Sequence, residues 1–200
     1  MTNRRQFLVS GLKASLAAIT FTGAIASVPS SALAHHTKRY RNFKLPKKYL
    51  PQRVTYRSKY RRGSIVVDPR NHYLYLIESS TRARRYGVGV GRAGLAFKGS
   101  ARIGRKAKWP TWTPTQNMIR REPHKYAKYA GGVPGGPTNP LGARALYLYR
   151  GKRDTYYRIH GTTAPWSIGQ SVSNGCIRMI NAHVEDLYAR VKVGTTVYVI

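Results

Sequence analysis

Acidic residues and cysteine are both scarce in this chain of 200 residues. Six Asp and Glu residues stand against 36 Lys and Arg residues, which gives a formal net charge of +30. Such a charge indicates an anionic partner or surface, and it leaves nucleic acid, an anionic envelope and acidic substrates open. The single cysteine, Cys176, excludes an intramolecular disulfide. A lone thiol is either an inert buried side chain or a reactive group, and its context must decide between them.

An unbroken hydrophobic run long enough to span a membrane is also lacking at the start of the chain. The apolar run of residues 16–28 is interrupted by threonine, glycine and serine. Arg4-Arg5 precede it and Ala32-Leu33-Ala34 follow it, which are the charged start and small-residue end of a secretory signal. The paired arginines followed by Phe7-Leu8 resemble the twin-arginine type. We predict an export signal over residues 1–34, cleaved after Ala34 without leaving a transmembrane anchor, and a location in the periplasm or cell envelope.

The predicted mature chain begins with a basic segment. Loss of the three basic residues of the signal leaves 33 Lys and Arg against 6 acids, or +27. Of the 28 residues in the range 35–62, 11 are Lys or Arg, and Pro46 and Pro51 interrupt the segment. This composition predicts an extended arm that is either a solvated tail or a means of binding anionic envelope polymer. The remaining range, 63–200, is long enough for one catalytic domain with a single core.

The pattern beyond Gly63 predicts a mostly β domain with one conspicuous helix. Runs rich in β-branched and aromatic residues, bounded by turn formers, predict strands at residues 64–68, 72–77, 84–90, 145–149, 156–160 and 195–200. The helix is expected from Asn181 to Val191, where apolar residues recur at helical spacing and Asn181 serves as the N-cap.

Two glycine-containing segments need separate interpretation. The range 109–141 holds six prolines and the run Gly131–Pro137, so we expect either a substrate-facing loop or a disordered insertion. Residues 89–94 match G-x-G-x-x-G, but no amphipathic helix follows, and no Asp or Glu occurs between Glu78 and Glu122. A dinucleotide site requires both features, so these glycines are expected to permit a bend or bulge in a strand.

The most informative pair of residues is His160 and Cys176. A thiol must lose its proton to attack a carbonyl, and a histidine near neutrality is suited to take that proton. The 15 residues between them form a spacer that can bring both together across adjacent strands. We therefore interpret Cys176 as the nucleophile of an acyl transfer and His160 as its general acid and base.

The residues that flank Cys176 suit the same chemistry. Gly175 permits close approach of substrate, and the backbone N–H groups of Gly175 and Cys176 are candidate donors to the oxyanion of a tetrahedral intermediate. If the segment after Cys176 is extended, Arg178 lies on the same face as the thiol. A guanidinium there would favour the thiolate and could pair with a substrate carboxylate.

At this point the sequence resembles a known family. His160, the spacer, the run Ser173–Met179 and Asn181 are similar to the active-site signature of the L,D-transpeptidase catalytic domain, also called the YkuD domain, and the resemblance extends over residues 65–200. It implies a β-sandwich-like fold with the cysteine at a strand end. It also implies attack by Cys176 on the bond between the diamino acid at position 3 and the terminal D-alanine of a peptidoglycan stem tetrapeptide.

The resemblance leaves the acyl acceptor open. An amine of a second stem would give a 3-3 cross-link, water would make the protein an L,D-carboxypeptidase, and a protein amine would make it an anchoring enzyme. A basic envelope-binding protein without catalysis is the alternative from another class. Nucleic-acid binding is not expected, because the chain carries an export signal and no recognised nucleic-acid module.

The chain departs from the family at Asn174, where the family usually has a histidine, which leaves His160 as the nearby histidine. Ser173 is a candidate orienter of the loop or of His160. Candidate substrate contacts are Arg178, Asn174, Trp166 and Gly161. No residues have metal-ligand spacing, and no cofactor is expected.

Overall fold

Strands dominate the residues that the computed structural model describes, which are 43–93 and 95–200. In chain order the elements are η1 (Lys47–Tyr49), β1 (Gln52–Thr55), β2 (Ile65–Asp68), β3 (Tyr73–Ile77), β4 (Arg82–Gly87), β5 (Val90–Gly91), β6 (Gly99–Lys108), α2 (Gln116–Arg121), α3 (Pro123–Tyr126), η2 (Ala127–Tyr129), β7 (Arg144–Arg150), β8 (Arg153–His160), η3 (Pro165–Ser167), β9 (Ser171–Ser173), β10 (Ile177–Arg178), α4 (Asn181–Arg190) and β11 (Thr196–Val199). The prediction of a mostly β fold is confirmed. The predicted export signal lies outside the described residues.

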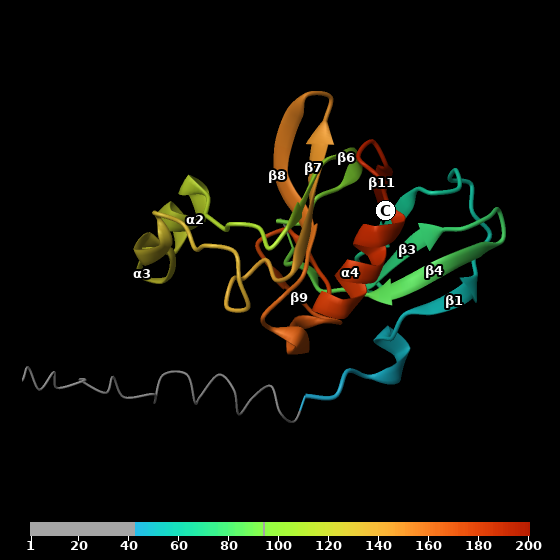
Figure 1. The fold of residues 1–200 in the computed structure, drawn as a ribbon, viewed down its shortest axis with the longest axis horizontal. Coiled ribbons are helices and arrows are strands. Elements are labelled where there is room, and N and C mark those ends of the chain that lie inside the picture. The colour runs from blue at the N-terminus through green and yellow to red at the C-terminus, as the bar shows by residue number, and fades with distance from the viewer. Residues whose placement is uncertain (1–42, 94) are drawn as a thin grey trace, which may run out of the picture. The chain divides into compact units, whose positions relative to one another are not determined.

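Within the described part of the chain, nine strands form one sheet in the order β1-β4-β3-β2-β11-β6-β7-β8-β10, and β5 pairs with β9 in a small second sheet. Neighbours in the large sheet are antiparallel except for β2 with β11 and β8 with β10. Figure 1 shows that β3 and β4 run across the direction of β7 and β8. The sheet thus bends around the core, with β11 in the middle of the order and the ten-residue β6 next to it.

The main hydrophobic core lies between the two halves of the bent sheet and α4. It joins buried side chains of β2, β3, β6, β7 and β8 to the inner face of the helix. Val184 and Leu187 are fully buried, as their helical spacing predicted. Full burial of a side chain of this size contributes about 1.5 to 3 kcal/mol, so α4 is held to the sheet by this apolar stripe.

The predicted basic arm is in part a component of the sheet. Among its described residues, 43–62, β1 pairs with β4 in antiparallel register, and Tyr49 is buried. Aromatic side chains cover a second, smaller cluster that contains Val66, Ile77 and Ala83; they are Tyr56, Tyr60, Tyr75 and Tyr198. The fold therefore does not begin at Gly63, because residues before it supply an edge strand and apolar cover.

Other local predictions had mixed outcomes. In the turn after β2, Asp68 accepts backbone hydrogen bonds from Arg70 and Asn71 at 3.1 and 3.2 Å. A bulge between Val90 and Gly91 confirms the role predicted for the glycines, and the next described element is β6 rather than a helix. The range 109–141 is not wholly irregular, since it contains α2 and α3.

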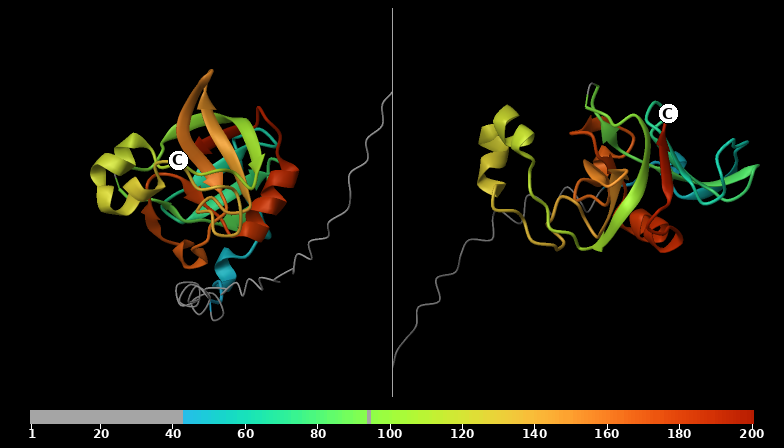
Figure 2. Two further views of the ribbon diagram at one scale, coloured as in Figure 1. Left: turned by 60° about the vertical axis from the view of Figure 1, so that its left-hand side comes forward. Right: turned by 90° about the horizontal axis from the view of Figure 1, so that it is seen from above.

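The α2–α3 pair stands away from the strands β1, β3 and β4, as Figure 1 and the right-hand view of Figure 2 show. Thr115 starts α2 as an N-cap, accepting a hydrogen bond from the Met118 N–H at 3.2 Å. Across residues 43–93 and 95–200, no helix is long and apolar enough to cross a membrane.

Candidate active site

The parallel pairing of β8 with β10 brings His160 and Cys176 to one end of the sheet. His160 is the last residue of β8, and Cys176 immediately precedes β10. Ile177 lies opposite Ile159, and Arg178 lies opposite His160. The spacer between them, which contains η3 and β9, therefore returns the chain to the strand that it left, as the sequence predicted.

The imidazole of His160 is held as a neutral base. Its side chain is 5% exposed, and Nδ1 donates a hydrogen bond to the Gly161 carbonyl at 2.6 Å. Burial, reinforced by the positive charge of Arg178, lowers the pKa of His160 to about 3. The neutral ring therefore carries its proton on Nδ1, and the Leu141 carbonyl is a second backbone hydrogen-bond partner of the ring.

The Cys176 thiol is partly exposed and protonated at rest. Its Sγ lies 3.8 Å from the Tyr156 carbonyl oxygen, a weak hydrogen bond. Burial raises the pKa of Cys176, while the backbone N–H and charge of Arg158 and the charge of Arg178 oppose that rise. A thiol in this state needs a base at the moment of attack, which His160 can provide.

The turn that carries the thiol is organised by Ser173. Its hydroxyl donates to the Cys176 carbonyl at 2.6 Å and accepts from the Gly175 N–H at 3.1 Å. Ser173 thus orients the loop and not the His160 ring. The Gly175 N–H makes this hydrogen bond within the turn, and its service as an oxyanion donor stays a prediction.

Gly175 is required at its position for a different reason. Its φ is +118°, and a Cβ there would lie 2.5 Å from the Leu95 carbonyl oxygen and 2.5 Å from the Tyr157 ring. The turn can therefore pass beneath these neighbours only without a side chain.

Sequence reasoning missed Arg158 and Tyr156, both on β8. The Arg158 guanidinium binds Asp154 in a bidentate pair at 2.7 and 2.8 Å and lies 4.3 Å above the Tyr147 ring. Tyr156 sits in the left-handed region at φ +61° within a bulge of β8, and its side chain is 70% exposed. The bulge turns the Tyr156 carbonyl to the thiol, and no sequence pattern signals it.

Asn181 has a role other than the predicted helix cap. Ile180 occupies the cap position, and no side chain caps this helix. The Oδ1 of Asn181 instead accepts the backbone N–H groups of Ala143 and Thr162 at 3.1 and 3.2 Å. It thereby fastens the segment that follows His160 to the start of β7.

The remaining predicted substrate contacts lie in different surroundings. Gly161 accepts the His160 hydrogen bond and packs against Asn181, whose Oδ1 would meet a Cβ at 2.1 Å. Trp166 is half-buried in η3, on the spacer. Arg178 bonds through its backbone to Gly89 and acts on both His160 and Cys176 through its charge.

Asn174 connects the turn of the nucleophile to the α2–α3 pair. Its Oδ1 accepts from Nη2 of Arg92 at 2.9 Å and from Nη2 of Arg121 at 2.8 Å. Its Nδ2 donates to the Tyr126 hydroxyl at 2.9 Å. The range predicted to face substrate is therefore docked beside Cys176, and α2 and α3 supply two of the three contacts.

Three or more potential metal ligands do not come together anywhere in residues 43–93 and 95–200. The chemistry that the described site offers is that of a thiol, an imidazole and two neighbouring guanidiniums. Such a set suits nucleophilic acyl transfer.

The comparison with protein families agrees with this geometry. The model of the L,D-transpeptidase catalytic domain, YkuD, matches residues 62–199. The chain belongs to the L,D-transpeptidase catalytic domain family.

Individual relatives differ in coverage. "Probable L,D-transpeptidase ErfK/SrfK" of Escherichia coli K12 is 35% identical over 153 residues, which cover 76% of this chain and 48% of that protein. The chain spans about half the length of the curated relatives it matches first. An L,D-transpeptidase from Mycobacterium smegmatis is 16% identical with a TM-score of 0.50 over 70% of this chain and 58% of that one, a likeness of fold alone.

A crystal structure from Brucella melitensis is more similar in sequence and is described under another activity. It is 55% identical with a TM-score of 0.54 and covers 76% of this chain and 93% of that chain. Its description is a probable carnitine operon oxidoreductase. In the present chain the glycines at 89 and 91 lead through β5 to β6, and the strand-to-helix turn of a dinucleotide fingerprint is not formed there.

Proposed function

We propose that this protein is a peptidoglycan L,D-transpeptidase that uses Cys176 as nucleophile and His160 as general acid and base. The observation that carries the proposal is the parallel pairing of β10, which Cys176 immediately precedes, with β8, which ends at His160. A partly exposed thiol and a neutral imidazole whose Nδ1 donates to Gly161 thus lie at the same end of the sheet. Membership of the family supports the substrate class.

In the proposed reaction, Sγ of Cys176 gives its proton to Nε2 of His160 as it attacks the carbonyl carbon of residue 3 of a stem tetrapeptide. The intermediate collapses with cleavage of the bond to D-alanine, whose amine takes the proton from His160. The side-chain amine of a second stem then attacks the thioester and loses a proton, and the thiol is restored. The product is a 3-3 cross-link.

The two guanidiniums near the thiol stabilise the thiolate that develops in the first step. The charges of Arg158 and Arg178 lower the free energy of the developing thiolate and so oppose the cost of its burial. The same charges disfavour an imidazolium, which supports transfer of the proton from His160 to the leaving amine.

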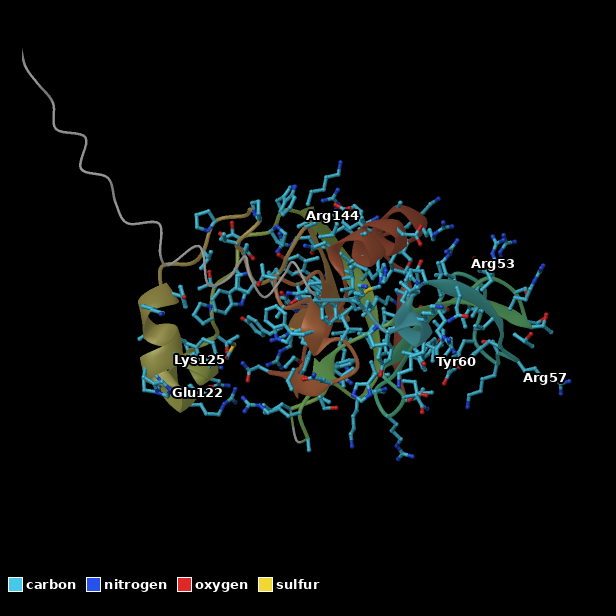
Figure 3. All side chains as sticks on the ribbon, turned by 90° about the horizontal axis from the view of Figure 1, so that it is seen from below. Arg53, Arg57, Tyr60, Glu122, Lys125 and Arg144 are labelled. Carbon is cyan, nitrogen blue, oxygen red and sulfur yellow. The ribbon has the colours of Figure 1, made fainter. Side chains whose placement is uncertain are left out.

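We further propose export through residues 1–34 to the periplasm or cell envelope, and binding to anionic envelope polymer there. The net charge of +27 that remains after removal of residues 1–34 supports this. A pocket of 460 Å³ is lined by Arg53, Arg62, Arg82 and Arg190 together with Glu78. Figure 3 places Arg53 and Arg57 at the end of the sheet away from Glu122 and Lys125, so this basic surface is separate from the α2–α3 pair.

The test is product analysis with purified protein, a tetrapeptide donor and an isotope-labelled amine acceptor. Release of D-alanine with a labelled 3-3 product supports the transpeptidase. Release with tripeptide as sole product would identify the L,D-carboxypeptidase. Absence of release in the wild type, equal to that of Cys176→Ala, would favour the non-catalytic envelope-binding protein.

A further inference from the structure

Two arginine side chains from separate segments meet at one uncharged oxygen. Arg92 follows β5 and Arg121 ends α2, yet both donate to Oδ1 of Asn174. An amide oxygen accepts hydrogen bonds but carries no net charge, so the two cations lie side by side without being neutralised there.

The charge around this pair is out of balance. Glu122 is the carboxylate in contact, at 3.1 Å from Arg92, 3.8 Å from Arg121 and 3.3 Å from Lys125. One carboxylate thus faces three cations. Their side chains are partly exposed, at 48% for Arg92, 41% for Arg121 and 56% for Lys125. A partly exposed cluster with excess positive charge attracts anions and leaves them access.

The cluster adjoins the nucleophile. Asn174 is two residues before Cys176, and a Cβ on Gly91 would lie 2.7 Å from the Cα of Gly175. The segment that carries Arg92 therefore packs directly on the turn of the thiol. The two guanidiniums are therefore held by a side chain of the same turn that carries Cys176.

We propose that Arg92 and Arg121 form a subsite that binds a carboxylate of the acyl donor, with Asn174 holding the pair in place. The inference rests on the proposed function, because it takes a stem peptide as donor. A guanidinium has five N–H donors in a planar fork suited to carboxylates. Within the described residues, the hydrogen bonds of the Arg92 and Arg121 guanidiniums are all donated by Nη2. The other N–H groups of each guanidinium are therefore available to a ligand. The carboxylate is either the terminal group of the leaving D-alanine or a side carboxylate of the stem.

The experiment measures single-turnover acylation of the full protein by three tetrapeptides: the native donor, its terminal carboxamide and its side-chain carboxamide. The wild type should discriminate against one carboxamide by roughly 10- to 100-fold, the range expected for a hydrogen bond to a charged group. The carboxamide that acylates the protein more slowly identifies the carboxylate that the subsite binds. In Arg92→Gln and Arg121→Gln, acylation by the native donor should be slower. The ratio of the acylation rate with the native donor to that with the carboxamide should fall towards one.

Arg120→Gln is the matched control. It removes the same charge from the same helix, but the Arg120 side chain bonds Asn117 and not Asn174, so discrimination should persist. Arg121→Lys keeps the charge without the fork and should retain part of the ratio; circular dichroism confirms folding of each variant. Equal acylation by all three donors, or unchanged discrimination in both glutamine variants, overturns this inference alone. A wild type that forms no acyl-enzyme with any donor overturns the proposed function as well.

Discussion

Mild acid should destabilise the fold through His160. The pKa of this residue is lowered to about 3 by burial and by the charge of Arg178, whereas a histidine in an unfolded chain has a pKa of about 6.5. Between these values the unfolded state binds one proton more than the folded state. The contribution to stability is therefore fully present above pH 6.5 and is lost as the pH falls towards 3.

The size of the loss follows from proton linkage. At pH 5 the folded imidazole is still neutral, while most unfolded chains carry a protonated His160. The free energy of unfolding should fall by about 2 kcal/mol between pH 7 and pH 5 on account of this residue. Burial also lowers the pKa of His183, so that residue adds a loss of the same sign.

Urea denaturation of wild type and His160→Gln at pH 7, 6 and 5 separates the contribution of His160 to the free energy of unfolding from that of His183. Glutamine can still donate to the Gly161 carbonyl but does not titrate. The difference between the proteins should shrink as the pH falls, because the wild type alone loses the His160 contribution. Parallel pH profiles for the two proteins would refute the reasoning.

Three further outcomes are expected. Asn181→Ala should lower the free energy of unfolding by about 2 to 4 kcal/mol in urea, because it leaves two backbone N–H groups without their acceptor; Asn181→Asp should recover most of the loss, and equal instability of both would contradict this. Alkylation of Cys176 by iodoacetamide should rise with pH beyond pH 9, because burial raises its pKa; a plateau below pH 7 would indicate a resting thiolate instead. His160→Ala should slow acylation by about 100- to 10,000-fold, the usual worth of general acid-base catalysis, and Asn174→Ala by much less; a larger loss at Asn174 would reverse the assignment of roles.

The sequence predicted those helices and strands that have a strong periodicity of apolar residues or that pair with a neighbour in the chain. Strands β2 and β3 and the helix α4 appear where alternation or helical spacing placed them. Strand β6 was not predicted, because Gly99, Gly104 and a run of basic residues obscure the alternation in which only Ala101 and Ile103 are buried. Strand β1 was hidden in the same way by the basic composition of its segment.

The candidate site likewise contains residues that the sequence predicted and contacts that it did not predict. The Cys176–His160 pair could be predicted, because the spacer between the two residues is long enough to bring the chain back beside the strand that it left. The parallel pairing of β10 with β8 is that return. The contacts of Asn174 with Arg92 and of Asn181 with Ala143 join positions 82 and 38 residues apart. Such pairs depend on how the whole sheet bends, and single-sequence patterns carry no signal for them.

The central claim is that the Cys176 thiol becomes acylated by a stem peptide. Rapid-quench mass spectrometry of the protein mixed with a tetrapeptide tests it most directly. The account predicts a transient mass increase equal to the donor minus D-alanine, mapped to the peptide that contains Cys176 and absent in Cys176→Ala. Release of D-alanine with no adduct on Cys176, or an adduct that persists in Cys176→Ala, would contradict it.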